Sequence, residues 1–495
     1  MISLRFAAAC LLLGAQLARM PAEAAAPRDF ENHLTRAVAL AGREGESFRL
    51  RDRMSHYLVP GVSVAIIQDC RVVDARGFGS AAPGGGGPVT RRTLFQAGSI
   101  SKTFAAVAAL RLVEQGRLSL DAVIRPILAS WVLPESPLTQ GRKVTLRGLL
   151  NHSAGINQEG GNGYPPGAPL PTLTDILEGR PPANTAPIRV ESAPGTRWRY
   201  SGGGYYIAEA LMRDATGTDY PRLIDRLVFR PLRLRDSSLS QPLDSGRVRL
   251  AARAAGPDGS ALEGGWRVNP ELAAAGLWTT PRDVARLLIA IAHGVRGERG
   301  AVLGPAASRE LMTRGLGNWG LGVALGPAAG PRRFGHTGHT IGFSSEYVIY
   351  PDSCQGAVVM TNADEGGWLV SEVLRAIGES YGWPDRPARP FQATIPLTHE
   401  IEARFVGTYQ LRDFPAERFS VTRRGGGLYW ARAGHVGREL LAESEGRLFS
   451  PDSKMLLEAE DPAADRAQTL ALSFGGGRNI AQRIERGAAS GEMPR

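Results

Sequence analysis

A serine and a lysine stand three positions apart in the segment Ser99-Ile100-Ser101-Lys102. Where a loop runs into a helix, this spacing puts both side chains on one helical face, within reach of each other. The positive potential at a helix N-terminus favours a serine alkoxide and lowers the pKa of the amine, and burial of the lysine acts in the same direction. A neutral Lys102 could then take the proton of Ser99, which predicts nucleophilic catalysis. The alternative is a capping serine beside a solvated lysine.

The composition makes this lysine conspicuous. Lysine and arginine together number 58 among 495 residues, but the lysines are three: Lys102, Lys143 and Lys454. Arginine serves equally well as surface charge, yet its guanidinium effectively never loses a proton. Because Lys143 and Lys454 have no motif around them, Lys102 occupies the one position where such a mechanism needs a deprotonatable amine.

Two further segments offer groups for the same reaction. Tyr200-Ser201 is followed by three glycines from Gly202 onward, which suits a tight loop that presents a phenol into a cleft. His336-Thr337-Gly338-His339 enters a strand, where the glycine lets a substrate lie against the strand edge and the following backbone N–H can point at an oxyanion. Read singly, either segment could be structural, as a core tyrosine beside a turn or a surface histidine.

Hydrophobic periodicity indicates the elements that must position these residues. A strong helix, rich in Ala, Leu and Val, directly follows the Ser-Lys segment, and strand-like runs lie near both ends of the first 380 residues. The expected elements are a mostly helical stretch over 28–58, strands over 61–67 and 72–78, a helix over 103–118, mostly helical structure over 120–310, strands over 334–362 and a helix over 368–377.

Composition also divides the chain. Residues 1–24 are typical of a secretory signal peptide, with Arg5, a short apolar core and the small-x-small site Ala22-Glu23-Ala24, which predicts a periplasmic or secreted protein. That apolar run is too short to span a membrane comfortably. A proline-rich linker is expected at 383–395. After it, residues 396–487 alternate short strands with glycine-rich turns, which predicts a small separate β domain.

Charge and cysteine content argue against several functions. The net charge is +10, but the arginines are scattered among acids and form no stripe, so nucleic acid is not an expected partner. Apart from Cys10 in the signal segment, the cysteines are Cys70 and Cys354, with no CxxC and no Cys/His cluster, so no metal or thiol cofactor is indicated. The expected partner is a small-molecule or peptide substrate, and the oligomeric state stays open.

The ordered motifs together resemble the serine β-lactamase and penicillin-binding-protein family. The nearest variety is the class C β-lactamase-like group of esterases, D-aminopeptidases and DD-peptidases. Flanking segments such as Leu149–Gly155 (LLNHSAG) and Ala275–Thr280 (AGLWTT) also look like family segments. The resemblance implies a hydrolase domain over 28–382, an α/β fold with an antiparallel sheet flanked by helices and a helical lobe. Residues 396–487 resemble the small β-barrel modules appended to some of these hydrolases.

Carried over position by position, the resemblance assigns the site. Ser99 would be the acylated nucleophile, Lys102 its activator and Tyr200 the general base or proton shuttle. His336-Thr337-Gly338 would face the substrate from the sheet edge. The backbone N–H groups of Ser99 and His339 would form the oxyanion hole. The reaction is then acyl transfer in two steps, without a metal.

Two departures from the family pattern bear on substrate. Gly202 stands where the family has asparagine, and His336 stands where it has lysine. Both changes weaken the case for penicillins and D-Ala-D-Ala peptides, unless Arg332 or Arg333 replaces the lost cation. We therefore expect an exported serine hydrolase of the esterase or D-amino-acid-directed peptidase type. The alternatives are a true β-lactamase or DD-carboxypeptidase and, from another class, an inactive relative that binds peptidoglycan or peptides.

The resemblance also has a consequence for the cysteines. In this family the first strand of the sheet neighbours the last. Cys70 ends the first strand and Cys354 begins the last, so both should lie at the same end of the sheet. We expect their Cα atoms within the ~7 Å that a disulfide requires.

Overall fold

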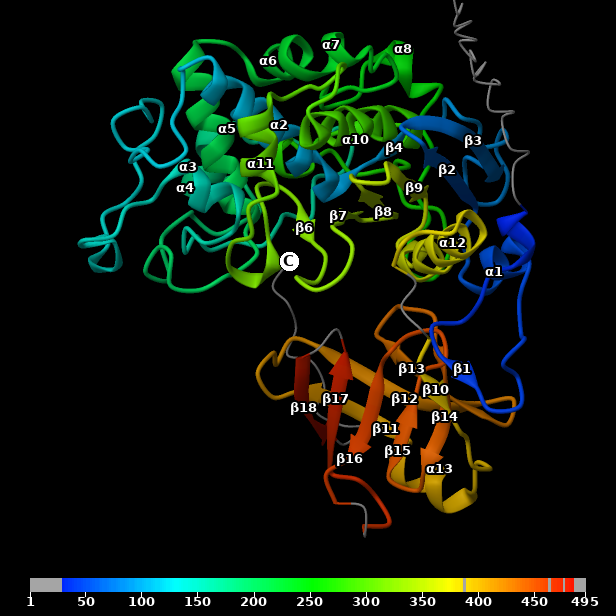
Figure 1. Cartoon of the computed structure of the whole chain (residues 1–495). Coiled ribbons are helices and arrows are strands. Elements are labelled where there is room, and N and C mark those ends of the chain that lie inside the picture. Colours follow the sequence, from blue (N-terminus) through cyan, green and yellow to red (C-terminus); the bar gives the residue numbers. More distant parts are fainter. Residues whose placement is uncertain (1–28, 386–388, 462–463, 475–476, 485–495) are drawn as a thin grey trace, which may run out of the picture.

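A computed structural model describes residues 29–385, 389–461, 464–474 and 477–484. The expected signal peptide at 1–24 lies outside these residues. Figure 1 shows a sheet covered by helices and, below it, a β-barrel formed by the last part of the chain. Within the described residues, no helix is both long and apolar enough to cross a membrane.

The main sheet has six antiparallel strands in the order β3-β2-β9-β8-β7-β6. The first long strand, β2, pairs with the last, β9, as the family resemblance implies. β2 is buried along nearly its whole length, because helices cover both faces of the sheet and leave no polar face to alternate. The strands are β2 (Gly61–Gln68), β3 (Arg71–Gly79), β6 (Ala324–Leu325), β7 (Phe334–Thr340), β8 (Phe343–Tyr350) and β9 (Gln355–Thr361).

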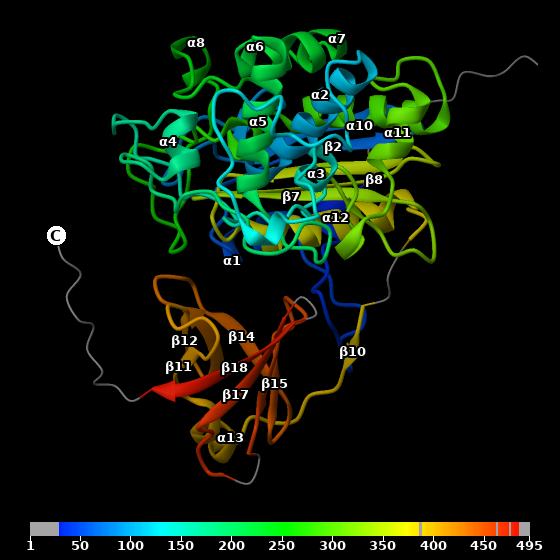
Figure 2. The ribbon, with the colours of Figure 1, turned by 90° about the vertical axis from the view of Figure 1, so that its left-hand side faces the viewer.

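Two hydrophobic cores lie on opposite faces of this sheet. On the face nearer the barrel, α12 packs against β8 and β9, and α1 packs against α12. On the other face, α2 and α10 cover the sheet, and the helical lobe lies beyond them (Figure 2). α2 is buried on nearly all sides because it lies between the sheet and the lobe. The helices are α1 (Leu50–His56), α2 (Ser101–Glu114), α3 (Leu146–Leu150), α4 (Leu173–Glu178), α5 (Gly202–Thr216), α6 (Tyr220–Ile224), α7 (Arg230–Leu232), α8 (Ser245–Val248), α9 (Leu272–Ala275), α10 (Pro281–Arg296), α11 (Pro305–Leu311) and α12 (Gly366–Tyr381).

The helix expected over 28–58 is largely wrong. Its described part contains a short 3₁₀ turn η1 (Phe30–Asn32), the strand β1 (Ala39–Leu40) and α1. β1 pairs in parallel with β10 (Phe391–Gln392), which lies within the stretch expected as a linker. Tertiary pairing with a segment some 350 positions away thus overrides the local helical pattern. The other short pair is β4 (Phe95–Gln96) with β5 (Trp278–Thr279).

The C-terminal part is a closed, eight-stranded antiparallel barrel, preceded by α13 (His399–Phe405). Each strand pairs with the next along the chain, and the last pairs with the first. This confirms the predicted fold class. The strands are β11 (Gly407–Leu411), β12 (Arg418–Arg424), β13 (Gly427–Arg432), β14 (Arg438–Ser444), β15 (Arg447–Phe449), β16 (Leu456–Ala459), β17 (Thr469–Phe474) and β18 (Gly477–Ile484).

The barrel is joined to the rest by buried charge. Asp452, in the turn between β15 and β16, accepts a hydrogen bond from Arg53 at 2.7 Å and lies 2.9 Å from His56 Nε2. Arg53 also donates to Glu372 on α12 at 2.6 Å. The helices that cover one face of the sheet are therefore linked directly to the barrel.

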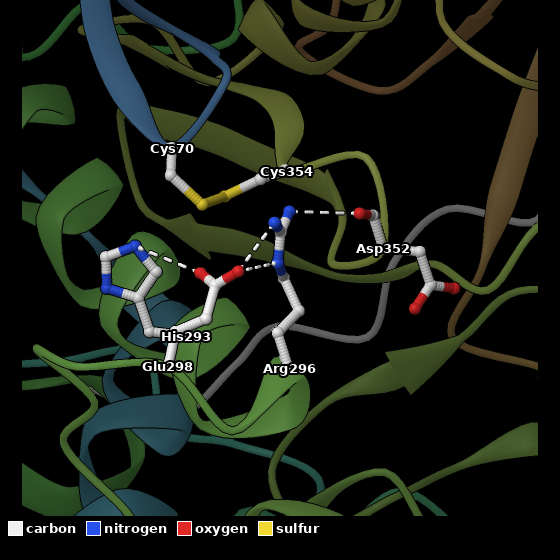
Figure 3. Close-up of a disulfide and its surroundings, with 6 residues drawn as sticks. All are labelled: Cys70, His293, Arg296, Glu298, Asp352 and Cys354. Atoms are coloured by element: carbon white, nitrogen blue, oxygen red, sulfur yellow. Dashed lines mark hydrogen bonds and ion pairs between the residues drawn. A yellow bond between two sulfur atoms is a disulfide. The ribbon is translucent and has the colours of Figure 1, made fainter. Parts of the chain in front are cut away.

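The two cysteines lie close together, as predicted, and they form a disulfide (Figure 3). Cys70 and Cys354 lie in the β2–β3 and β8–β9 turns, with Cα atoms 5.0 Å apart. The bond joins positions 284 residues apart in the sequence. It links the first long strands of the sheet in the sequence, β2 and β3, to the last ones, β8 and β9.

Candidate active site

Ser99 and Lys102 meet at the beginning of α2, as their spacing predicts. Ser99 lies in the 3₁₀ turn η2 (Gly98–Ile100) that leads into the helix. Lys102 Nζ is 2.9 Å from Ser99 Oγ and donates to the carbonyl oxygen of Ala274 at 2.9 Å. When Lys102 is neutral, the first contact runs the other way, with the Ser99 hydroxyl donating to Nζ.

Burial sets the protonation of Lys102. The side chain is 2% exposed, and this burial lowers the pKa of Lys102 from its usual range to about 7. A large fraction of the amine is therefore neutral at neutral pH. This is the condition that the proton transfer from Ser99 requires.

A second buried residue contacts α9, the helix whose Ala274 carbonyl accepts from Lys102. Glu209 on α5 accepts a hydrogen bond at 2.9 Å from the backbone N–H of Ala273, the neighbour of Ala274 on α9. Burial raises the pKa of Glu209 to about 8. The sequence analysis missed Glu209, although an acid within an apolar helical stretch was a visible signal.

Tyr200 lies beside both groups. Its phenol lies near the Ser99 side chain, and Lys102 Nζ is 5.1 Å from the centre of its ring. Burial raises the pKa of Tyr200 well above its usual range, and the interaction with the Ser99 side chain offsets this in part. The side chain is therefore a neutral phenol at physiological pH, able to donate and pass on a proton.

The predicted substrate-facing segment forms β7. Thr340 and Phe343 flank a two-residue turn, so they form a hydrogen-bonded pair, and the pair His339–Ser344 is then a non-hydrogen-bonded one. The N–H of His339 consequently points away from β8. On that side β6 reaches only Phe334 and Gly335 among the described residues.

The turn η2 fills the neighbouring space. A Cβ atom on Gly98, which has φ +51°, would lie 2.6 Å from the backbone nitrogen of His339, and one on Gly338 would lie 2.0 Å from the carbonyl oxygen of Ala97. Both glycines are therefore required for the close approach of β7 to Ser99. The structure brings Ser99 and His339 together, as an oxyanion hole made from their N–H groups requires.

His336 carries no positive charge. It is buried, and burial together with the nearby Lys102 lowers the pKa of His336 to about 3. Its Nδ1 lies 2.5 Å from the Thr337 carbonyl oxygen, so the proton of the neutral ring resides there. A neutral imidazole thus stands where the family has a lysine.

Both arginines that could replace that cation are already paired with carboxylates. Arg332 is paired with Asp352, and Arg333 lies 3.2 Å from Asp385. The other departure also has a steric reason, because a Cβ atom on Gly202 would lie 2.7 Å from the carbonyl oxygen of Glu159. An asparagine at this position would require the 159–160 backbone to move.

Aromatic rings that the sequence analysis did not assign to the site surround it. The ring of His152 lies 4.4 Å from that of Tyr200, and Trp319 lies 5.4 Å from His336 and 5.5 Å from Trp198. Burial holds the pKa of His152 well below its usual range, so this ring is neutral too. His152 lies in the family-like LLNHSAG segment, whereas nothing in the sequence indicated that Trp319 lies at the site.

Metal-ligating side chains gather elsewhere. Among the described residues, the groups of three that could hold an ion are Cys70, His293 and Glu298 beside the disulfide (Figure 3), and Asp364, Glu365 and His435 at the barrel. The first includes a disulfide sulfur, and in the second Glu365 is already paired with Arg438. Neither group includes Ser99, Lys102 or Tyr200.

The sequence model of the Beta-lactamase family matches residues 49–380, more than half of the chain. The chain belongs to the beta-lactamase family. This confirms the resemblance seen in the motifs, and the chain is a serine hydrolase of the beta-lactamase and penicillin-binding-protein type.

The relatives of this beta-lactamase family member include penicillin-binding proteins and an esterase. Penicillin-binding protein 4 of Amycolatopsis lactamdurans is 27% identical over 67% of this chain and 88% of its own length. Esterase EstB of Burkholderia gladioli is 32% identical over 40% of this chain and 52% of its own length. The octameric penicillin-binding protein homologue from Pyrococcus abyssi has the same fold, with a TM-score of 0.57 and 21% identity over 88% of this chain and 98% of its own.

Proposed function

We propose that the protein is an exported hydrolase that forms an acyl-enzyme on Ser99 with ester or amide substrates, as an esterase or a D-amino-acid-directed peptidase. We assign catalysis to residues 28–382 and treat 396–487 as a separate domain joined by the 383–395 linker. The main support for this substrate class is that His336 is neutral, because penicillins would need a carboxylate-binding cation at its position. A disulfide is consistent with a periplasmic or secreted location.

The geometry supports two steps. Neutral Lys102 takes the hydroxyl proton of Ser99 while Oγ bonds to the substrate carbonyl carbon, and the N–H groups of Ser99 and His339 stabilise the oxyanion. Tyr200 then passes the proton to the leaving alcohol or amine as the carbonyl–heteroatom bond breaks. Water adds to the acyl-enzyme and releases the acid, which restores the Ser99 hydroxyl.

The walls of the site favour neutral substrates. His336 offers an uncharged ring, and Trp198 and Trp319 add apolar surface beside it. A substrate carboxylate placed against the neutral His336 ring would lose water without gaining an ion pair from that ring, which costs binding free energy. Esters or amides with neutral acyl groups avoid this cost.

A penicillin-directed activity is the second candidate. The relatives named penicillin-binding protein and putative D-alanyl-D-alanine carboxypeptidase favour it. From another class, an inactive peptidoglycan- or peptide-binding protein is favoured by Gly202, where the family's substrate-contacting amide is lost.

One comparison separates these functions. The wild type and Ser99→Ala are exposed to a fluorophosphonate, a nitrophenyl ester, a D-alanyl peptide, a fluorescent penicillin and a chromogenic cephalosporin. We expect Ser99-dependent labelling by the fluorophosphonate and turnover of the ester or the peptide. Turnover of the cephalosporin alone would establish a β-lactamase, and absence of both labelling and turnover would establish a binding protein.

A further inference from the structure

A single helical turn, α9, lies between the proposed base and the helix α5. α9 packs against both α2 and α5, which lie side by side (Figure 2). Its Ala274 carbonyl oxygen accepts a hydrogen bond from Lys102 Nζ at 2.9 Å, and Ser99 Oγ lies 2.9 Å from the same nitrogen. The amine of Lys102 is therefore held between a backbone carbonyl and the serine.

The carbonyl determines how this amine is oriented. A neutral amine has two N–H groups and one lone pair, so it can donate to Ala274 while it accepts the hydroxyl proton of Ser99. If the carbonyl moved away, the amine could turn an N–H group toward the serine instead. The lone pair would then no longer point at the proton that it must take.

Hydrogen bonds fix α9 at both of its ends. On the C-terminal side, the N–H of Leu277 donates to Ser101 Oγ at 3.1 Å, so this end is tied to the residue before Lys102. On the N-terminal side, the N–H of Ala273 donates to Glu209 Oε2 at 2.9 Å. An N–H in the first turn of a helix has no acceptor within that helix, so Glu209 supplies what α9 itself cannot.

Glu209 stands in surroundings that disfavour a carboxyl group. It is 2% exposed, and its neighbours in α5, Ala208 and Ala210, are buried as well. Burial raises the pKa of Glu209 to about 8, so the group is mostly protonated and neutral at neutral pH. The oxygen of a neutral carboxyl accepts a hydrogen bond much as an amide oxygen does, which makes glutamine a close substitute.

We propose that Glu209 is a positioning residue for acylation. Through its hydrogen bond to α9, it keeps the Ala274 carbonyl where that carbonyl orients Lys102 toward the serine. Glu209 acts only through α9, so it is not itself a catalytic residue. The inference rests on the proposed function, in which Lys102 is the base, and it adds the residue that holds this base in its reactive orientation.

This role has two measurable consequences. Loss of the hydrogen bond to α9 should lower kcat and leave KM nearly unchanged, because it affects the base and not the bound substrate. The Ala274 carbonyl also stabilises the protonated amine more than the neutral one, so its displacement should lower the pKa of Lys102 below about 7. Glu209→Leu, which keeps an apolar side chain but removes the acceptor, should show both effects, and Glu209→Gln should show neither.

The pKa of Lys102 can be measured without any substrate. The chain has three lysines, so the full chain labelled with carbon-13 lysine gives NMR signals from three Cε atoms, and Lys102→Arg identifies the one that is lost. The signals are followed from pH 5 to 9. We expect a midpoint near pH 7 in the wild type and Glu209→Gln, and one about one pH unit lower in Glu209→Leu, the effect of one hydrogen bond. An unchanged midpoint in Glu209→Leu would overturn the proposal.

The rate of Ser99 labelling by a fluorophosphonate tests the same role in the reaction. We expect Glu209→Leu to be slower by about tenfold to a hundredfold, as for a misplaced reacting group, and Glu209→Gln to match the wild type. With an ester, kcat should fall by the same factor at constant KM. A wild type that is not labelled would refute the proposed function, whereas a labelled wild type with an equally fast Glu209→Leu would refute the positioning role.

Glu114→Leu is the matched control. Glu114 makes the same kind of bond, to the N–H of Gly304 at 2.7 Å, at the other end of α2, so its loss should leave labelling unchanged. Circular dichroism checks the folding of each variant. If Glu209→Leu does not fold, Glu209→Asp, which shortens the side chain by one methylene, replaces it and should change both measurements in the same direction. Equal slowing of labelling in the leucine and glutamine variants of Glu209, or in Glu114→Leu, would contradict the proposal.

Discussion

At the scale of single residues, the proposed mechanism depends on one amine that can lose its proton. Lys102 is held by Ser99 and by the Ala274 carbonyl, and its burial removes the water that would keep it charged. Arginine cannot take its place, since guanidinium stays protonated. We predict that Lys102→Arg lowers the rate of Ser99 labelling by a fluorophosphonate by about 10²- to 10⁴-fold, the usual range for loss of a general base. Lys143→Arg is the matched control, and full labelling in Lys102→Arg would refute this mechanism.

The same amine sets the pH dependence. Because the reactive form of Lys102 is the neutral one and its pKa is about 7, acylation should be slow in acid and should rise through a midpoint near pH 7. His336, with a pKa of about 3, does not titrate in that range. The pre-steady-state rate of ester acylation, measured from pH 5 to 9, checks this. His336→Gln should keep the rising limb, whereas a flat profile in the wild type would contradict the assignment.

At this scale, the sequence predicted contacts between residues that are close together in the chain, but not contacts between distant residues. The Ser99–Lys102 contact was predictable because one helical turn connects the two residues. Glu209 and Trp319 were not, since each reaches the site through segments far away in the chain. The neutrality of His336 was equally hidden, because it follows from burial beside Lys102 rather than from residue type.

At the scale of elements, the close contact between β7 and η2 brings together the two N–H groups of the proposed oxyanion hole. Gly338→Ala would force its Cβ against the Ala97 carbonyl oxygen and push β7 away from Ser99. We predict that kcat for an ester falls by about 10²- to 10³-fold, as when one oxyanion donor is lost.

A glycine elsewhere provides the control for that strand. Gly367 on α12 has open space where a Cβ would be added, so Gly367→Ala should keep full activity. Circular dichroism and thermal unfolding of both variants separate misfolding from misalignment. A well-folded Gly338→Ala enzyme with normal kcat would show that the contact is dispensable.

For helices and strands too, the sequence predicted what local patterns determine and missed what distant pairing determines. The helix after Ser99 and the paired strands of the sheet carry their pattern within a few residues, and α2, β2 and β9 are present where expected. The helix predicted over 28–58 was largely wrong because β1, within this stretch, is formed by pairing with β10. No local pattern could show that pairing.

At the scale of the whole molecule, Asp452 ties the barrel to the helices of the sheet. Burial alone would raise the pKa of Asp452, but His56, Arg53 and Arg36 outweigh it and hold the pKa well below its usual range. The carboxylate therefore stabilises the fold above about pH 4, and this contribution is lost as the pH falls. We predict that Asp452→Asn lowers the free energy of unfolding by about 3 kcal/mol, the lower end for a broken buried pair.

The measurement is urea unfolding at neutral pH. Glu135→Gln, which breaks an exposed pair with Arg125, is the control and should change stability by less than about 1 kcal/mol. Equal effects of the two substitutions would show that the buried network is not what holds the parts together. Nothing in the sequence distinguishes Asp452 and Arg53 from ordinary surface charges, whereas the glycine-rich turns predicted the separate barrel.

The disulfide acts at this scale as well. It closes a loop of 284 positions, and a cross-link over so long a loop restricts the unfolded chain far more than the folded one. Chain-entropy arguments then give a stabilisation of up to about 5 kcal/mol. We predict that Cys70→Ser with Cys354→Ser lowers the urea midpoint while the folded enzyme keeps its kcat, because neither cysteine contacts Ser99, Lys102 or Tyr200. Reduction of the wild type should reproduce the shift and leave the double variant unchanged. A loss of kcat in a fully folded double variant would show instead that the disulfide helps to position the catalytic residues by holding the sheet.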